Sequence, residues 1–176
     1  MAKRQIARMS RFFILEFITY ICFMSKITTI DQAGLDFIKQ EEGCVLHPYR
    51  DQAGVPTIGI GMTYYPDTGK TVTMNDPHLT QEQADNLFLL MVKPRLHTVS
   101  TLTREDLTQN QYNALVDFEY NTGHLNGSTL LKLVNAKQDP APGFLMWDKI
   151  HVDGVLKEDE GLKERREREI KLYKTA

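Results

Sequence analysis

The amino-acid sequence predicts one α+β domain that is mostly helical, with its only sheet near the N-terminal end. The chain has 176 residues, 41% of them hydrophobic, which is enough for one sizeable core. Short stretches rich in Tyr, Val, Thr and Ile, separated by turn-forming residues, occur at residues 47–65. From residue 80 onward, helix-capping pairs and apolar residues at three- and four-residue steps recur instead.

The first predicted helix starts near residue 29. Apolar or small residues recur along it at three- and four-residue steps: Ile30, Ala33, Gly34, Phe37 and Ile38. Thr29 or Asp31 can cap its start, and Gly43 suits the position that follows the end of a helix. The pattern therefore places Glu42 on the last turn.

A β-hairpin or small sheet is predicted next, over residues 47–65. The turn at residues 51–54 separates its two stretches. Gly59 and Gly61 alternate along the second stretch, as where another backbone or a ligand approaches closely. Residues 65–79 are predicted to form a loop.

Two helices with capping boxes are predicted after this loop. Thr80 precedes Gln83 by three residues, and Thr108 precedes Gln111 in the same way. Pro94 is expected to kink or end the first of these helices.

The C-terminal part of the chain is also predicted to be helical. Ser128 is expected to cap one helix, and a short helix is predicted around residues 144–147. The last helix is predicted over residues 160–174. It carries two outward pairs of opposite charge four residues apart, Glu164–Arg168 and Glu167–Lys171.

Charge and composition argue against several classes of function. The net charge of −2 gives no basis for expecting a nucleic-acid partner. The two cysteines, Cys22 and Cys44, are too few for a disulfide framework and lack metal-ligand spacing. The five histidines are scattered without the i,i+4 pairing of a zinc helix. We therefore expect neither a metal site nor a cofactor.

The N-terminal segment, residues 1–24, differs in character from residues 25–176, which form the predicted domain. Its basic start is followed by an apolar run at residues 12–24, broken only by Glu16. The run is shorter than the roughly 20 residues that span a bilayer, and no small-x-small cleavage site follows it. Three interpretations stay open: a membrane-directing segment, a dispensable extension ahead of a start at Met24, or a helix that packs on the domain.

Glu42, Asp51 and Thr57 are the candidate catalytic residues. A helix that ends at Glu42 and a hairpin that carries Asp51 and Thr57 can bring two acids and a hydroxyl to one wall. Cleavage of the acetal linkage between sugars needs an acid that protonates the leaving oxygen and a carboxylate that activates water. Packing on Ile38 is expected to desolvate Glu42, whereas backbone amides in the turn keep Asp51 ionised. Thr57 can hold the attacking water against Asp51.

The segment FIKQEEGCVLHPYRDQAGVPTIGIGMT resembles the N-terminal signature of the bacteriophage lysozymes, glycoside hydrolase family 24. The matching positions are Glu42-Gly43, Tyr49, Asp51, Gly54 and Thr57-Ile58-Gly59-Ile60-Gly61. The blocks LTQEQADNLF, LTQNQYNALVDFEYNTG, GSTLLKLVN, the Trp147 segment and GLKERREREIKLY follow in the family's order. The resemblance covers about residues 29–174 and implies a lysozyme-like fold with a helical C-terminal lobe.

The resemblance also implies a reaction and roles for the three candidates. Glu42 would be the general acid, Asp51 the carboxylate that positions or activates water, and Thr57 its hydrogen-bonding partner. The implied reaction is the hydrolysis, usually inverting, of the β-1,4 bond between N-acetylmuramic acid and N-acetylglucosamine in peptidoglycan glycan strands. Glu41 is the rival of Glu42, and only the Glu-Gly step and the nine-residue interval to Asp51 exclude it.

Three further residues are candidates for substrate binding. The resemblance places Tyr120 and Asn121 on the opposite wall of the saccharide cleft, although a core aromatic and a helix-stop asparagine are equally good interpretations. Gly59 is the third candidate. Trp147 is expected in the core rather than as a sugar platform. Met62 stands where the family commonly has His, and we expect it to be an apolar filler.

Two alternatives to a muramidase stay open. One is a lysozyme-like binding or localisation module with little turnover. The other is a lytic transglycosylase, which forms a 1,6-anhydro product without water. The joint presence of Glu42, Asp51 and Thr57 favours the hydrolase over both.

The biological setting is implied by the resemblance alone. It suggests an endolysin of a phage or prophage, and an antibacterial effector would use the same hydrolysis. We expect a monomer made in the cytoplasm that acts on the cell wall, either released through a holin or directed to the membrane by residues 1–24. In some signal-arrest-release members of the family, thiol exchange near the catalytic glutamate activates the enzyme, and Cys22 and Cys44 are candidates for such a switch.

Overall fold

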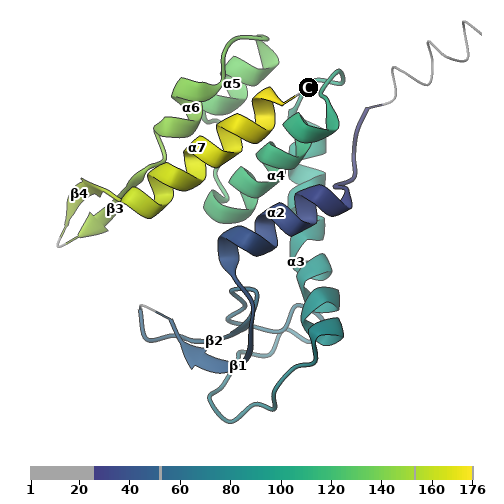
Figure 1. Cartoon of the computed structure of the whole chain (residues 1–176), viewed down its shortest axis with the longest axis vertical. Helices are drawn as coiled ribbons and strands as arrows, with labels where there is room; N and C mark the ends of the chain where they lie inside the picture. The colour runs from purple at the N-terminus through teal and green to yellow at the C-terminus, as the bar shows by residue number, and fades with distance from the viewer. Residues whose placement is uncertain (1–25, 52, 153, 176) are drawn as a thin grey trace, which may run out of the picture.

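The computed structural model describes residues 26–51, 53–152 and 154–175, and these form two lobes (Figure 1). The helices are α2 (Gln32–Glu42), α3 (Gln81–Leu102), α4 (Gln109–Thr122), α5 (Thr129–Asn135), α6 (Ala141–Leu145) and α7 (Glu160–Lys174). The strands are β1 (Val45–Arg50), β2 (Pro56–Gly59), β3 (Lys149–Val152) and β4 (Val155–Glu158). The interpretations of residues 1–24, and of Cys22 among them, lie outside the described residues. Within the described ranges, no helix has the length and apolarity needed to cross a bilayer.

The β lobe contains β1, β2 and the loop that leads to α3. The two strands are antiparallel, with Tyr49 opposite Thr57. A small core beneath them contains Ile58, Met62, Val72 and Leu87. Met62 is fully buried there and exchanges two backbone hydrogen bonds with Ile58. The prediction that Met62 fills apolar space is therefore confirmed.

The helical lobe is built around α4, which packs against α2, α3 and α7. Every residue from 112 to 119 is buried, because helices cover α4 on several sides. Such a helix needs no strong polar face. The core of the helical lobe also contains Phe88, Val92 and Val99 from α3. Because Leu87 of α3 lies in the core of the β lobe, α3 contributes to both lobes and joins them.

The predicted helix starts are confirmed at the level of individual hydrogen bonds. Thr80 and Thr108 each accept from the backbone N–H three residues ahead, and the capping boxes with Gln83 and Gln111 are complete. Ser128 caps α5 by accepting from the Leu131 N–H. At α2 the cap is Asp31, which accepts from the Gly34 N–H.

The prediction that Pro94 could end its helix is wrong. Helix α3 continues past Pro94 to Leu102. The carbonyl that loses its hydrogen-bond donor belongs to Leu90, which is exposed, so water can take the place of the missing N–H. Val92 and Val99 are buried on either side of the proline and anchor both halves of the helix.

The prediction of a single sheet near the N-terminal end is also wrong. A second antiparallel hairpin, β3–β4, projects from the helical lobe just before α7 (Figure 1). The sequence does contain a signal for it, because an Asp-Gly pair between Val152 and Val155 favours a tight hairpin turn.

Two smaller differences concern the last helices. Helix α6 begins at Ala141, earlier than the predicted short helix at 144–147. Of the two outward pairs predicted on α7, Glu164–Arg168 forms at 3.4 Å. Glu167 and Lys171 form no ion pair in the described part of the chain.

Candidate active site

Glu42 is the last residue of α2 and lies where the two lobes join (Figure 1). Gly43 ends the helix with a φ of 71°, in the left-handed region, and its N–H donates to the Lys39 carbonyl oxygen. A residue with a side chain would be strained in this conformation. The Glu-Gly step thus determines where the chain leaves α2 and which residue stands at its end.

Asp51 is held by the backbone of its own turn. Its Oδ1 accepts from the N–H groups of Ala53 (2.9 Å) and Val55 (2.8 Å). Oδ2 has no hydrogen-bond partner among the described residues. The prediction of backbone amides around Asp51 is confirmed, and one oxygen stays free to accept from water or substrate.

Thr57 is buried in β2, and its hydroxyl does not bond Asp51. Oγ1 donates to the Val55 carbonyl oxygen at 3.0 Å. Because this bond uses the hydroxyl proton, the oxygen keeps its lone pairs to accept from a water. A water bound at Thr57 and Asp51 would therefore donate one proton to each.

Tyr49 lies near both candidate acids. Burial raises the pKa of the Tyr49 phenol, and the charges of Asp51 and then Glu42 raise it further. Both carboxylates therefore lie near the Tyr49 ring.

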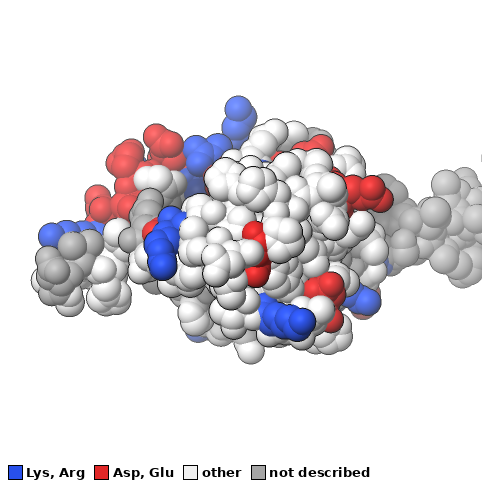
Figure 2. Space-filling view, turned by 90° about the horizontal axis from the view of Figure 1, so that it is seen from below, with Lys and Arg blue, Asp and Glu red and all other residues white. Residues whose placement is uncertain are grey.

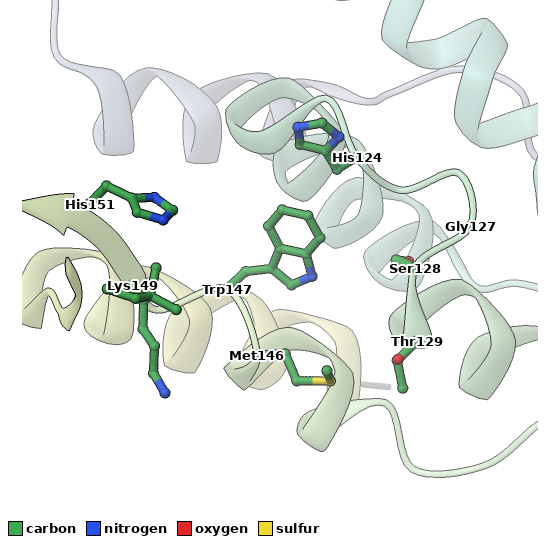
Figure 3. A pocket seen from close by; sticks show the side chains of 9 residues that line it. His124, Gly127, Ser128, Thr129, Met146, Trp147, Lys149 and His151 are labelled. Carbon is green, nitrogen blue, oxygen red and sulfur yellow. The ribbon is translucent and has the colours of Figure 1, made fainter. Parts of the chain in front are cut away.

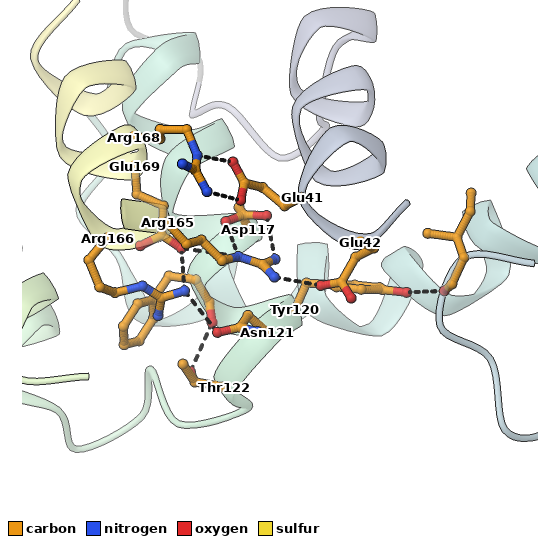
Figure 4. Close-up of polar contacts among 12 residues, drawn as sticks. Glu41, Glu42, Asp117, Tyr120, Asn121, Thr122, Arg165, Arg166, Arg168 and Glu169 are labelled. Carbon is orange, nitrogen blue, oxygen red and sulfur yellow. Dashed lines mark hydrogen bonds and ion pairs between the residues drawn. The ribbon is translucent and has the colours of Figure 1, made fainter. Parts of the chain in front are cut away.

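Glu42 contacts a buried arginine that sequence reasoning did not single out (Figure 4). Arg165 Nη1 donates to Glu42 Oε1 at 2.7 Å. Its Nε and Nη2 donate to the two oxygens of Asp117, at 3.1 and 2.8 Å. Burial works against the Arg165 charge, but Asp117 and then Glu42 outweigh it and raise the pKa of the guanidinium. Glu42 is thus paired with a buried cation and not surrounded by apolar side chains alone, and its desolvation by packing on Ile38 stays a prediction.

Oε2, the second carboxylate oxygen of Glu42, accepts no hydrogen bond from a described residue. A side chain at Gly61 would come within 3.5 Å of it, so the Gly61 backbone lines the space in front of this oxygen. In both Glu42 and Asp51, one carboxylate oxygen is hydrogen-bonded and the other has no partner among the described residues.

Glu41, the alternative to Glu42 as general acid, is bound by a different arginine, Arg168. Arg168 holds both of its oxygens, through Nε at 2.6 Å and Nη2 at 2.8 Å. This bidentate contact fixes Glu41 against α7. Both oxygens of Glu41 are thus engaged by Arg168, and the choice of Glu42 over Glu41 stays a prediction.

Tyr120 and Asn121 lie at the end of α4, and both reach toward the site. The Tyr120 hydroxyl donates to the Ile60 carbonyl oxygen at 3.3 Å and so joins the two lobes. Burial and the nearby charge of Glu42 raise the pKa of this phenol, which therefore stays protonated. Asn121 Oδ1 accepts from Arg166 Nη2 at 2.8 Å, and its amide NH₂ has no partner in the described structure.

Gly59 is buried inside the β lobe, with a φ of 64°. A side chain there would lie 2.4 Å from Met62 Cε. Packing against Met62 thus accounts for the glycine. A direct contact of Gly59 with substrate stays a prediction.

Trp147 is partly buried in the core and partly exposed to a cavity. Its ring meets Phe118 edge to face at 5.7 Å and stacks on His124 at 5.3 Å. The exposed side lines a cavity of about 600 Å³ between the loop before α5 and the β3–β4 hairpin (Figure 3). The prediction of a core role is confirmed for the contact with Phe118.

At the site, the described residues form neither a disulfide nor a metal-binding cluster. Cys44 is exposed, and Gln81 Nε2 lies 3.8 Å from its sulfur. In the described residues, no three His, Cys, Asp or Glu side chains gather closely enough to hold a metal ion. A switch involving Cys44 stays a hypothesis, since Cys22 is outside the described ranges.

Arg165 and Asp117 are the residues that sequence reasoning missed. Asp117 is an acid inside a run of mostly apolar residues, 114–118, which is a signal for a buried partner. Arg165 belongs to the run ERRERE, where repeated charges hide which one points inward. Arg165, Arg166 and Glu169 of this run are all buried, and only the contact of Arg165 with Glu42 identifies it as part of the site.

Comparison with known proteins identifies the family of the chain. The Phage lysozyme family profile matches residues 39–169. The endolysin of Salmonella phage P22 is 36% identical over 148 residues, covering 82% of this chain and 97% of that protein. The structure of an endolysin from Escherichia coli O157:H7 phage FAHEc1 superposes with a TM-score of 0.78 at 35% identity, over 83% and 93% of the two chains.

A third similar structure, the muramidase domain of SpmX from Asticaccaulis excentricus, has a TM-score of 0.72 at 28% identity, over 84% of this chain and 99% of that one. The profile match spans most of the chain, and both relatives and solved structures match over more than four fifths of it. The chain therefore belongs to the phage lysozyme family of muramidase-type peptidoglycan hydrolases.

Proposed function

We propose that Glu42 is the general acid of this muramidase and that Asp51, with Thr57, positions and activates the attacking water. The observation that carries this proposal is the shared arrangement of the two acids. Each has one oxygen anchored, Glu42 by Arg165 and Asp51 by two backbone N–H groups, and one oxygen without a partner in the described structure.

The water side is built around Asp51. Its free Oδ2 and the Thr57 hydroxyl oxygen can each accept one proton of the same water. This leaves a water lone pair directed at the anomeric carbon of N-acetylmuramic acid. As the oxygen–carbon bond forms, Asp51 takes the water proton.

The leaving-group side is built around Glu42. Its Oε2, in front of Gly61, gives a proton to the glycosidic oxygen as the bond to the anomeric carbon breaks. Glu42 is then a carboxylate, and Arg165, held by Asp117, stabilises that charge. Attack by water on the face opposite the leaving group gives inversion at the anomeric carbon.

The test uses the full chain, purified peptidoglycan and three matched variants. Glu42→Gln and Asp51→Asn keep the side-chain volume and remove a carboxyl group. They are expected to lose on the order of 10²- to 10⁴-fold in rate. Glu41→Gln is the control, since Arg168 holds Glu41 away from Asp51. It is expected to keep the wild-type rate within about tenfold.

The products are identified by mass spectrometry, and the anomer formed first by NMR. Reducing N-acetylmuramic acid ends of inverted configuration support the proposal. Anhydro ends would show a lytic transglycosylase. Loss of activity in Glu41→Gln, with Glu42→Gln active, would exchange the roles of the two glutamates. A folded wild-type chain that cleaves nothing would favour the binding module.

We also propose that the protein is an endolysin, because the relatives that it matches over most of its length carry that name. The monomeric state and an association with the membrane through residues 1–24 stay predictions.

A further inference from the structure

Glu169 is a fully buried acid one turn beyond Arg165 on α7. Its Oε1 is 2.9 Å from Arg166 Nη2 and 4.0 Å from Arg165 Nε. Neither of its oxygens accepts a hydrogen bond from the described residues. A carboxylate without hydrogen bonds in a protein interior is strongly disfavoured relative to the neutral acid.

The nearest donors hydrogen-bond to other acceptors, although Arg166 Nη2 stays 2.9 Å from Glu169 Oε1. Arg165 Nε donates to Asp117 Oδ2, and Arg166 Nη2 donates to Asn121 Oδ1. Asp117 itself is fully buried next to Glu169 (Figure 4). Two adjacent buried carboxyl groups are best accommodated when one carries a proton and donates it to the other.

We propose that Glu169 is held as a neutral carboxylic acid that donates its proton to Asp117, and that this proton keeps Arg165 positioned between Asp117 and Glu42. Glu169 is thus a positioning residue. This inference rests on the proposed role of Glu42. The raised pKa of Glu169 agrees with it, since burial, the charge of Asp117 and a hydrogen bond with Asp117 all favour the protonated form.

The other charged groups around Glu169 come from three helices. On α7 these are Arg165 and Arg166, whose charges oppose the rise only in part. On α4 the group is Asp117. On α2 the acids are Glu42, bound to Arg165, and Glu41, bound to Arg168. Helix α6 also packs on α7 and contributes no titratable side chain.

The charge count explains why the proton matters. With Glu169 neutral, the charges of Arg165 and Arg166 match the carboxylate of Asp117 and, once Glu42 has given up its proton, the carboxylate of Glu42. Ionised Glu169 would add a negative charge near Arg165 Nε, on the side away from Glu42 (Figure 4). The guanidinium would be drawn inward, and its hydrogen bond to Glu42 Oε1 would weaken.

The direct test is carboxyl-carbon NMR of the wild-type full chain labelled at glutamate. The Glu169 signal is assigned by its absence in Glu169→Gln. We expect a neutral carboxylic acid at about pH 6.5, far above the usual glutamate range of about 4.3. A Glu169 signal that titrates in that usual range would overturn the proposal, whatever the activity of the enzyme.

The functional test compares the pH dependence of peptidoglycan cleavage. Across the midpoint at which the NMR signal of Glu169 titrates, the kcat of wild type is expected to fall roughly tenfold more than that of Glu169→Gln, since the amide cannot ionise but still donates to Asp117. Glu164→Gln is the control for an exposed acid on α7 and should follow the wild-type profile. A Glu169→Gln profile that superposes on wild type would refute the positioning role.

These outcomes are separable from the proposed function. If Glu42→Gln stays active, the role of Glu42 fails, whereas the NMR signal still reports the proton on Glu169. If Glu42→Gln is inactive and Glu169 is ionised, the general acid stands and only the present inference fails.

Discussion

The two acids of the site are held in place by different kinds of structure. Asp51 takes its hydrogen bonds from residues two and four positions away, within one turn. Glu42 is bound by Arg165, which is 123 positions away and is itself held by Asp117 on a third helix. The position of Asp51 is thus a local property of the β lobe, and that of Glu42 depends on the packing of the helical lobe.

This contrast has a consequence for mutation. A local turn can lose one interaction while the rest of the protein stays folded. A buried ionic cluster cannot, because each charge left without its partner remains in the interior. Seen from the β-lobe end, charged side chains are scattered among uncharged ones (Figure 2). The buried ionic cluster of Asp117, Arg165, Arg166 and Glu169 lies on the α7 side of the site.

The largest effect is expected for Arg165→Ala. It leaves Asp117 buried without its two donors, so the free energy of unfolding should fall by about 3–5 kcal/mol, and cleavage should fall with it. Urea unfolding measures the change. Lys163→Ala is the control, since its ion pair with Glu160 is exposed on both sides, and a much smaller loss is expected. Equal losses in the two variants would contradict the contrast.

Gly59→Ala tests the β lobe by overpacking. The new methyl group would lie 2.4 Å from Met62 Cε, at a φ of 64°. A loss of about 1–3 kcal/mol is expected. Combining it with Met62→Ala should recover the part that comes from the clash. If the double variant shows only the sum of the two single losses, packing against Met62 is not the reason for the glycine.

The pH dependence of stability tests Glu169 apart from activity. In the unfolded chain Glu169 ionises near 4.5, and in the folded protein its pKa is raised. Between these two values the folded protein holds the extra proton. The free energy of unfolding should therefore fall as pH rises, by up to about 1.4 kcal/mol per pH unit, and level off above the folded pKa. Glu169→Gln should lack this component, so identical pH dependence in both proteins would argue against a raised pKa.

The smallest effect on stability is expected for Asp51→Asn. The amide oxygen of Asn can accept from both Ala53 and Val55, so the turn keeps its hydrogen bonds. The free energy of unfolding should change by less than about 1 kcal/mol, although catalysis is lost. A loss comparable to that of Arg165→Ala would show that Asp51 is not held locally.

Much of the fold and half of the site follow from the sequence alone. The capping boxes at Thr80 and Thr108 place two helix starts, because a cap is a contact between residues three positions apart. The turn around Asp51 follows for the same reason. The Glu-Gly step places Glu42 at the end of its helix, since few residues other than glycine tolerate the conformation of Gly43.

Only the tertiary structure decided the rest. Helix α3 passes Pro94 because both of its halves are anchored in the core, which no local rule contains. Arg165 is one of several charged residues on α7, and its role becomes visible only when α7 packs against α2 and α4. The environment of Glu42 is likewise set by contacts across the whole chain. Local interactions are encoded in neighbouring residues, whereas the protonation and orientation of a buried group depend on every charge that folding brings around it.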